Sequence, residues 1–143
     1  MALRVVVAED NLLVREGIIK LLEHQEQLEV AGSCGTYDEL IALVDREMPD
    51  VVLTDIRMPP THTDEGIQAA RWMREHHPKV GVVVLSQYAT PGYAHALFEN
   101  GSDSRAYLLK DRVADVDEVV FAIEAVASGV SVVDHHIVAE LVS

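Results

Sequence analysis

Three acidic residues stand at the ends of two apolar runs, where their side chains could act together on one ligand. Asp55 closes a run that begins at Val51, and Glu9 and Asp10 follow the run Arg4–Ala8. Short β-branched runs that end in loops are typical of buried strands. If the two strands are parallel neighbours, three carboxylates meet in one crevice, which is costly unless a hard cation or a reaction requires it.

Phosphoryl transfer to a carboxylate is the chemistry that such a cluster suits. A carboxylate can attack a phosphoryl group and form a mixed anhydride, provided that the negative charge between the two is neutralised. Mg²⁺ can do this, since it prefers one or two carboxylates together with phosphate oxygens and waters. A hydroxyl and a cation should converge on the same place, and Ser86 and Lys110 close two further apolar runs.

Each of these residues also has a simpler role when it is considered alone. Glu9 and Asp10 could cap the following helix, where their charge is favourable. Asp55 could form a turn, Ser86 could be a loop hydroxyl, and Lys110 could be a solvated strand end. Their joint occurrence at the ends of four strands favours one common site.

The elements that position these residues alternate between strand and helix about five times. Strands are predicted near residues 3–8, 28–33, 50–54, 80–85 and 105–109. The intervals carry apolar residues at helical spacing, as at Tyr37, Leu40, Ile41 and Val44. This alternation predicts an α/β fold with a doubly wound, five-stranded parallel sheet of order 2-1-3-4-5, as in flavodoxin-like proteins. In that order strands 1 and 3 are neighbours, so their carboxylates meet at the switch point of the sheet.

Composition excludes several classes of protein. The chain of 143 residues is long enough for one domain, and its formal net charge of −13 argues against direct nucleic-acid contact. No apolar stretch approaches the length of a membrane span, and the N-terminus lacks a signal-peptide pattern. A cytoplasmic location without membrane contact is therefore expected. The single cysteine, Cys34, is expected to be a small buried hydrophobe.

Four motifs together resemble the receiver domain of bacterial two-component response regulators over residues 3–128. They are Ala8-Glu9-Asp10-Asn11, Leu53-Thr54-Asp55-Ile56-Arg57-Met58-Pro59, Leu85-Ser86-Gln87-Tyr88 and Ala106-Tyr107-Leu108-Leu109-Lys110. The resemblance implies that Asp55 accepts phosphate from a sensor histidine kinase. It also implies that the domain is not a metabolic enzyme, because it catalyses only its own phosphorylation and dephosphorylation.

The resemblance implies a metal site around Asp55. Glu9 and Asp10 would bind Mg²⁺ alongside Asp55, and the backbone carbonyl of Arg57 would supply the third protein oxygen. Lys110 would hold the phosphoryl group.

It further implies a switch and partner surface near the ends of strands 4 and 5. Ser86 would be the switch hydroxyl, and Tyr107 would be the aromatic residue that changes position with it. Tyr88 belongs to the same predicted surface.

Two departures from the common receiver pattern resemble the NarL/LuxR-type branch: Asp111 follows Lys110 where many receivers have proline, and Tyr88 follows Ser86-Gln87. Regulators of that branch carry a C-terminal helix-turn-helix domain. Residues 1–129 are therefore predicted to form the receiver, and residues 130–143 to begin a linker to an absent effector domain, with a short helix from Asp134 through Leu141. DNA would be contacted only through that effector domain, and the resemblance also allows a homodimer.

Three alternatives remain open. The chain could be a stand-alone receiver that acts by protein contact. An aspartyl-phosphate hydrolase of the haloacid-dehalogenase type would need an Asp-x-Asp pair after strand 1, which Glu9-Asp10 does not provide. A flavodoxin-like cofactor binder would need a phosphate-binding loop there, where Asp10 would repel phosphate. The histidine pairs at 76–77 and 135–136 are predicted to lie on the surface, because no further ligands complete a metal site.

Overall fold

Strands and helices alternate along the chain in the computed structural model, which describes residues 2–87, 91–99, 101, 103–111, 115–133 and 138. The elements are β1 Leu3–Ala8, α1 Leu12–Glu23, β2 Leu28–Cys34, α2 Tyr37–Glu47, β3 Val51–Asp55, α3 Glu65–His76, β4 Gly81–Ser86, α4 Pro91–Phe98, β5 Arg105–Leu109, α5 Val116–Ala127 and β6 Val132–Val133. None of the described helices combines the length and apolar character that crossing a bilayer requires.

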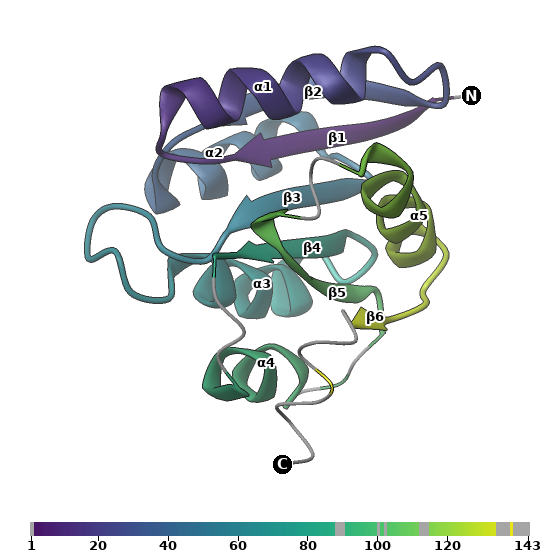
Figure 1. Cartoon of the computed structure of the whole chain (residues 1–143). Coiled ribbons are helices and arrows are strands. Elements are labelled where there is room, and N and C mark those ends of the chain that lie inside the picture. The colour runs from purple at the N-terminus through teal and green to yellow at the C-terminus, as the bar shows by residue number, and fades with distance from the viewer. Residues whose placement is uncertain are drawn as a thin grey trace.

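The strands form one parallel sheet of order β2-β1-β3-β4-β5-β6 (Figure 1). The predicted order of the first five strands is confirmed, but the predicted number of strands was too low by one. Val132 and Val133 pair with Ala106 and Tyr107 along the free edge of β5. Two valines after a helix end carry no periodicity, so this strand depends on the unpaired backbone groups of β5 rather than on a local pattern.

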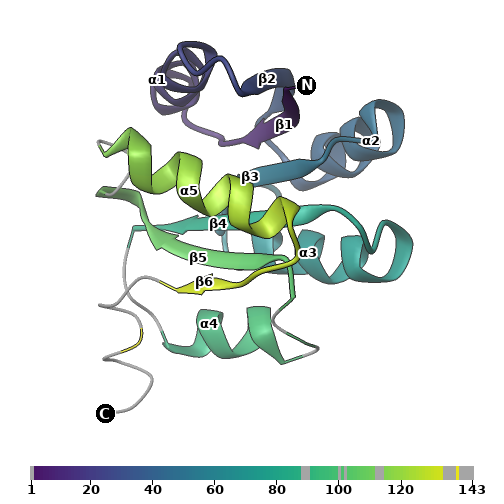
Figure 2. The same ribbon diagram turned by 90° about the vertical axis from the view of Figure 1, so that its right-hand side faces the viewer.

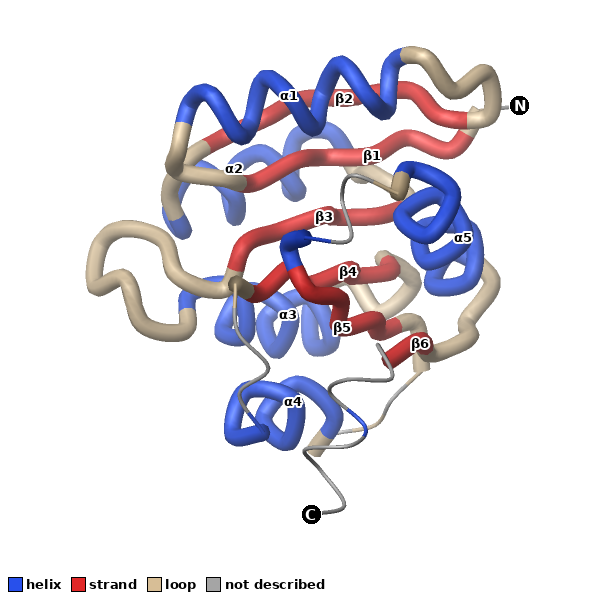
Figure 3. The backbone as a smooth tube through the Cα atoms, in the orientation of Figure 1, coloured by secondary structure: helices blue, strands red, loops and turns tan. Residues whose placement is uncertain are grey.

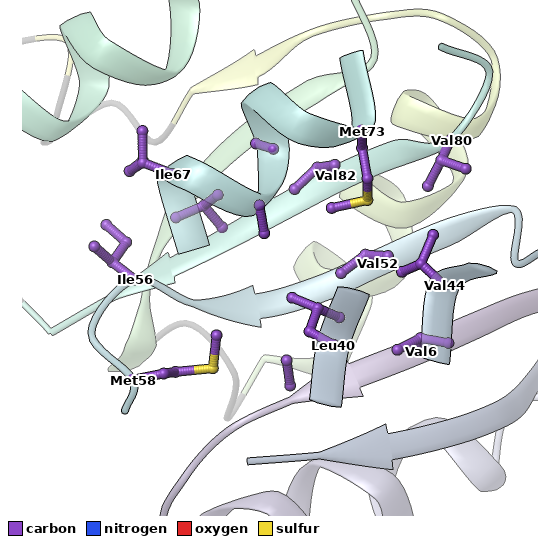
Figure 4. Close-up of a cluster of buried hydrophobic side chains, with 14 of the residues drawn as sticks. Val6, Leu40, Val44, Val52, Ile56, Met58, Ile67, Met73, Val80 and Val82 are labelled. Atoms are coloured by element: carbon purple, nitrogen blue, oxygen red, sulfur yellow. The ribbon is translucent and has the colours of Figure 1, made fainter. Parts of the chain in front are cut away.

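Helices cover both faces of the sheet (Figure 2). One layer is α1 with α5, and the other is α2 with α3 and α4. Alternate residues of β1 enter the two layers, since Val5 and Val7 pack toward α1 and α5 whereas Val6 packs toward α2 and α3. Figure 4 shows the second layer, in which Leu40 of α2 and Met73 of α3 are both fully buried. The predicted two-sided apolar core is thus present.

The last long helix ends just before residue 129, the last residue of the predicted receiver. α5 ends at Ala127, Ser128 caps it, and Gly129 adopts a left-handed φ of 91°, a conformation that favours glycine. The linker predicted from residue 130 stays a prediction, although Val132 and Val133 belong to the sheet. Apart from Val138, the predicted helix from Asp134 to Leu141 lies outside the described residues.

The carboxyl ends of the strands form one edge of the sheet, and the connection from β3 to α3 extends beyond that edge as a long loop (Figure 3). Gly66, the second residue of α3, lies directly against the end of β3. Its backbone N–H donates to the carbonyl oxygen of Ile56 at 2.8 Å, and a Cβ at this position would lie 2.1 Å from the carbonyl oxygen of Asp55. Only glycine therefore fits at this close approach.

Candidate functional site

The three predicted carboxylates meet at the carboxyl edge of the sheet. β1 pairs with β3 so that Ala8 lies opposite Thr54, and the residues that follow these two positions become neighbours. One ligand oxygen from each of Glu9, Asp10 and Asp55 lies within 4.8 Å of the others. The strand order therefore assembles the cluster that the sequence predicts.

The acidic pair after β1 does not cap the following helix. Asn11 is the N-cap of α1, and its side-chain oxygen accepts a hydrogen bond from the Val14 N–H at 3.1 Å. This leaves both carboxylates free to face the crevice. The simpler role considered for Glu9 and Asp10 is therefore wrong, because the neighbouring asparagine takes it.

Lys110 reaches into the cluster from the end of β5. Its Nζ lies 3.0 Å from Asp55 Oδ2 and 3.0 Å from Glu9 Oε2. Burial lowers the pKa of Lys110, but hydrogen bonds and charge from Glu9 and Asp55 outweigh this effect, so the pKa lies above its usual value. One ammonium group thus contacts two of the three carboxyl groups of the cluster.

The cluster has more negative charge than its protein partners neutralise. Glu9 is only 1% exposed, and burial together with the charge of Asp55 raises its pKa to about 7, even though Lys110 opposes the shift. A divalent cation would relieve this repulsion. All three side chains offer carboxylate oxygens, which suit a hard ion such as Mg²⁺.

Asp55 presents one defined oxygen to the crevice. Its Oδ1 accepts a hydrogen bond from the Ile56 N–H at 2.8 Å, while Oδ2 faces Lys110. The Thr54 hydroxyl donates to the Asp55 carbonyl at 2.8 Å and fixes the strand end. The carboxylate is therefore oriented, with Oδ2 turned toward the ligand side.

The predicted switch residues lie in different surroundings. Ser86 is buried at the end of β4 and lines a small hollow with Asp55 and Lys110. Tyr107 is fully buried in β5, and its role as a switch residue stays a prediction. Tyr88 lies outside the described residues.

Arg57 lines the same hollow, but its side chain is directed at α4. Its Nε donates to the Tyr93 hydroxyl at 3.2 Å, its guanidinium carbon lies 5.8 Å from the centre of the Tyr93 ring, and that hydroxyl donates to the carbonyl of Thr63 at 2.9 Å. The exposed Arg57 side chain is thus held against Tyr93. Coordination of a metal by its backbone carbonyl stays a prediction.

The loop between β3 and α3, together with the first residue of α3, supplies two residues that sequence reasoning missed. Glu65 is buried and accepts hydrogen bonds from the Thr61 N–H at 2.7 Å, from the Thr61 hydroxyl, and from the Thr63 N–H at 2.9 Å. Between the two threonines, His62 reaches back to Asp10. The available signal was the length of the polar stretch after Pro60, which is unusual beside a predicted site.

The other candidate residues of the sequence stay outside the site. His77 contacts Asp45 at 2.8 Å, and His76 stacks on Trp72. Among the described residues, the carboxylate cluster alone has the spacing of a metal site. His135 and His136 lie outside the described residues. Burial raises the pKa of the Cys34 thiol to about 12, so this cysteine is unreactive.

Comparison with known proteins identifies the domain type. The family model of the response regulator receiver domain matches residues 5–127. The transcriptional regulatory protein DegU of Brevibacillus brevis is 32% identical over 127 residues, which cover 89% of this chain and 51% of that protein. The chain thus spans about half the length of the curated relatives that it matches.

Solved structures agree with this match. A LuxR-family two-component response regulator from Aurantimonas has a TM-score of 0.83 at 25% identity, covering 99% of this chain and 96% of that one. The receiver domain of the response regulator NarL from Mycobacterium tuberculosis has a TM-score of 0.73 at 29% identity, covering 86% and 97%. Both similarities extend over nearly the whole of the solved chain.

Proposed function

Because the chain belongs to the response regulator receiver domain family, in its NarL/LuxR-type branch, we propose that Asp55 accepts a phosphoryl group from the phosphohistidine of a sensor histidine kinase. The observation that carries this proposal is the contact of Lys110 with both Asp55 and Glu9, across strands that are far apart in the sequence. This contact places a nucleophile, a cationic side chain and an acidic pair in one crevice.

The reaction would be an exchange of bonds at phosphorus. Asp55 Oδ2 attacks, the bond from phosphorus to the histidine nitrogen breaks, and the product is an aspartyl phosphate. Oδ2 is assigned as the attacking oxygen because it faces Lys110, the group that would hold the phosphoryl oxygens, whereas Oδ1 accepts from the Ile56 N–H. No acid or base is needed on Asp55, since an ionised carboxylate is already nucleophilic.

Glu9, Asp10 and Asp55 would hold Mg²⁺, with the carbonyl of Arg57 as a further ligand. The bound ion would neutralise charge between the carboxylate and the phosphoryl oxygens. The raised pKa of Glu9, which burial and the charge of Asp55 produce, supports the binding of Mg²⁺ at this site.

Lys110 and Ser86 would convert the new phosphoryl group into a change at the surface. Lys110 already contacts Asp55 Oδ2, so its ammonium group would move only a short distance to pair with a phosphoryl oxygen. Ser86 lines the same hollow and would donate its hydroxyl, with the buried Tyr107 responding beside it. A receiver domain is a signalling protein, and its product is a shifted population of conformations.

The output would be transcription regulation through a helix-turn-helix effector domain in a longer, cytoplasmic protein, with a homodimer as a further partner. The support is that the relative DegU is a transcriptional regulatory protein about twice as long as this chain. The net charge of −13 supports DNA contact by the effector rather than by the receiver.

The test is phosphoryl uptake from acetyl phosphate with Mg²⁺, followed by intact mass. The wild type should gain one phosphoryl group, Asp55→Asn should gain none because an amide is not a competent nucleophile, and Asp117→Asn, on the exposed face of α5, should match the wild type. Uptake by the Asp55→Asn variant at the wild-type rate would refute the proposal.

A further inference from the structure

The backbone that carries Glu9 and Asp10 is held by contacts with three other elements. The N–H of Glu9 donates to the carbonyl of Cys34 at 2.9 Å, and the Glu9 carboxylate contacts Lys110. The carbonyl of Glu9, in the peptide unit that joins the two acidic residues, accepts a hydrogen bond from Nη1 of Arg15 at 3.2 Å. Arg15 thus holds the peptide unit whose orientation sets how the Asp10 side chain lies relative to that of Glu9.

The guanidinium of Arg15 reaches this carbonyl from α1, through space that a glycine leaves open. Gly35 directly follows β2, and a Cβ at this position would lie 2.8 Å from Arg15 Nη1. The same Cβ would lie 3.5 Å from both the Glu9 carbonyl oxygen and the Asp10 Cα. Gly35 does not adopt a left-handed φ, so the close contact with Arg15, rather than the backbone conformation, accounts for a glycine here.

The contribution of Arg15 to stability explains its position poorly. The side chain is half-buried, and its Nε is buried without a hydrogen-bond partner among the described residues. A buried donor that lacks an acceptor lowers the stability of a fold and offsets the hydrogen bond that Nη1 makes. Replacement of Arg15 by an apolar residue of similar length should therefore leave the fold intact.

We propose that Arg15 is a positioning residue of the metal site, which orients the peptide unit between Glu9 and Asp10 so that both carboxylates face one divalent cation. This inference rests on the metal site of the proposed function and deepens it. Arg15 acts through the Glu9 carbonyl rather than on the ion itself. The loss of groups that orient metal ligands from such an outer position typically lowers metal affinity by about 10- to 100-fold.

The charge of Arg15 predicts the opposite effect on metal binding, which makes the proposal testable by sign. A guanidinium near the site repels a divalent cation, so removal of its charge alone should strengthen Mg²⁺ binding. Removal of a contact that positions the ligands should weaken Mg²⁺ binding instead.

The test is an NMR titration of the ¹⁵N-labelled chain with Mg²⁺. Arg15→Met keeps a side chain of similar length but removes the guanidinium, and it should weaken Mg²⁺ binding by about tenfold. Lys20→Met removes an exposed positive charge from the same helix, and it should stay within about twofold of the wild type because exposed charges are screened.

A second variant displaces the guanidinium without removing it. In Gly35→Ala the new Cβ meets the far end of the Arg15 side chain, which can swing aside at little cost in stability. Mg²⁺ binding should weaken in this variant too. Gly35→Ala should have no further effect when it is added to Arg15→Met, because both changes break the same contact.

The rate of phosphoryl uptake from acetyl phosphate supplies an independent readout. In Arg15→Met the Mg²⁺ concentration for half-maximal rate should rise by about tenfold. The rate at saturating Mg²⁺ should stay within about twofold of the wild type, because Asp55 and Lys110 are unchanged.

Mg²⁺ binding that is unchanged or tighter in Arg15→Met overturns the role of Arg15 alone. If Arg15→Met fails to fold, Gly35→Ala decides by itself, and unchanged Mg²⁺ binding in that variant overturns the proposal. Absence of Mg²⁺ binding in the wild type, or binding that Asp10→Asn leaves unchanged, overturns the metal site and this inference with it.

Discussion

Two glutamates at the carboxyl edge of the sheet are almost equally buried, yet their carboxyl groups behave oppositely. Glu9 is 1% exposed and its pKa is raised to about 7, mainly by burial and then by the charge of Asp55. Glu65 is 2% exposed. Burial raises its pKa too, but hydrogen bonds from Thr61 and from backbone N–H groups outweigh burial and hold the pKa at about 2.

The difference shows that burial does not decide the state of a carboxylate; the donors around it do. Glu65 receives N–H and O–H donors from its own loop, and its charge is satisfied. Glu9 shares one lysine with Asp55, and its charge remains in excess. The first arrangement stabilises a loop, whereas the second is prepared for a cation.

We expect the largest loss of stability from a substitution at Gly66, which lies next to Glu65 and against the end of β3. In Gly66→Ala the new Cβ would meet the Asp55 carbonyl at 2.1 Å, so both the end of β3 and the start of α3 must move. We expect a loss of about 3 kcal/mol or more in the free energy of unfolding, measured with urea.

The matched control for this change is Gly17→Ala in α1, where no atom lies within 4 Å of the added Cβ. That variant should gain up to about 1 kcal/mol from helix propensity. Equal losses of unfolding free energy in the two variants would show that the close contact with Asp55 does not cause the loss in Gly66→Ala.

Glu65→Gln should cause the next largest loss, about 2 kcal/mol, because an amide has one acceptor oxygen where the carboxylate has two. The effect should depend on pH. Since the folded pKa is about 2 and the ordinary value is 4.5, the stabilisation by Glu65 is present above about pH 4.5 and is lost as the pH falls toward 2. Glu75→Gln, on the exposed side of the same helix, should show no such loss at any pH.

Glu9→Gln should have the opposite sign in the metal-free protein. The folded pKa of Glu9 lies near 7 and its ordinary value is 4.5, so ionised Glu9 opposes folding as the pH rises from 4.5 to 7. The variant should therefore become more stable than the wild type over that range, by about 1 kcal/mol after allowance for solvent screening. Its binding of Mg²⁺ should weaken. Urea unfolding in EDTA between pH 5 and 8 measures the gain, and a constant difference across that range would contradict the assignment.

The smallest effect concerns the link from Arg57 to α4. Arg57 and Tyr93 together border the hollow beside Asp55, and we expect them to slow attack of water on an aspartyl phosphate. Arg57→Ala should speed dephosphorylation by less than about tenfold, which corresponds to about 1.4 kcal/mol.

Tyr93→Phe should fall between Arg57→Ala and the wild type, because it removes the hydroxyl contact but keeps the ring beneath the guanidinium. Tyr37→Phe in α2 is the control. Equal or slower decay in Arg57→Ala would show that this side chain does not shield the bond.

Local pattern was enough to predict most of the fold. Apolar runs and helical spacing depend on residues a few positions apart, and they yielded the parallel sheet and the order of five strands. The strand order then brings Glu9 and Asp55 together, because parallel neighbours deliver the residues at their ends to one edge. The two-residue β6 was missed because it has no pattern of its own.

The sequence by itself therefore determined the kind of site: which carboxylates, which lysine and which edge of the sheet. Only the tertiary structure decided how the charges are shared. Lys110 contacts Glu9, which lies 101 positions away in the chain. Glu65 accepts hydrogen bonds from the loop that precedes it, and His62 contacts Asp10. These contacts depend on the three-dimensional positions of donors and acceptors, so the periodicity of the sequence does not predict them.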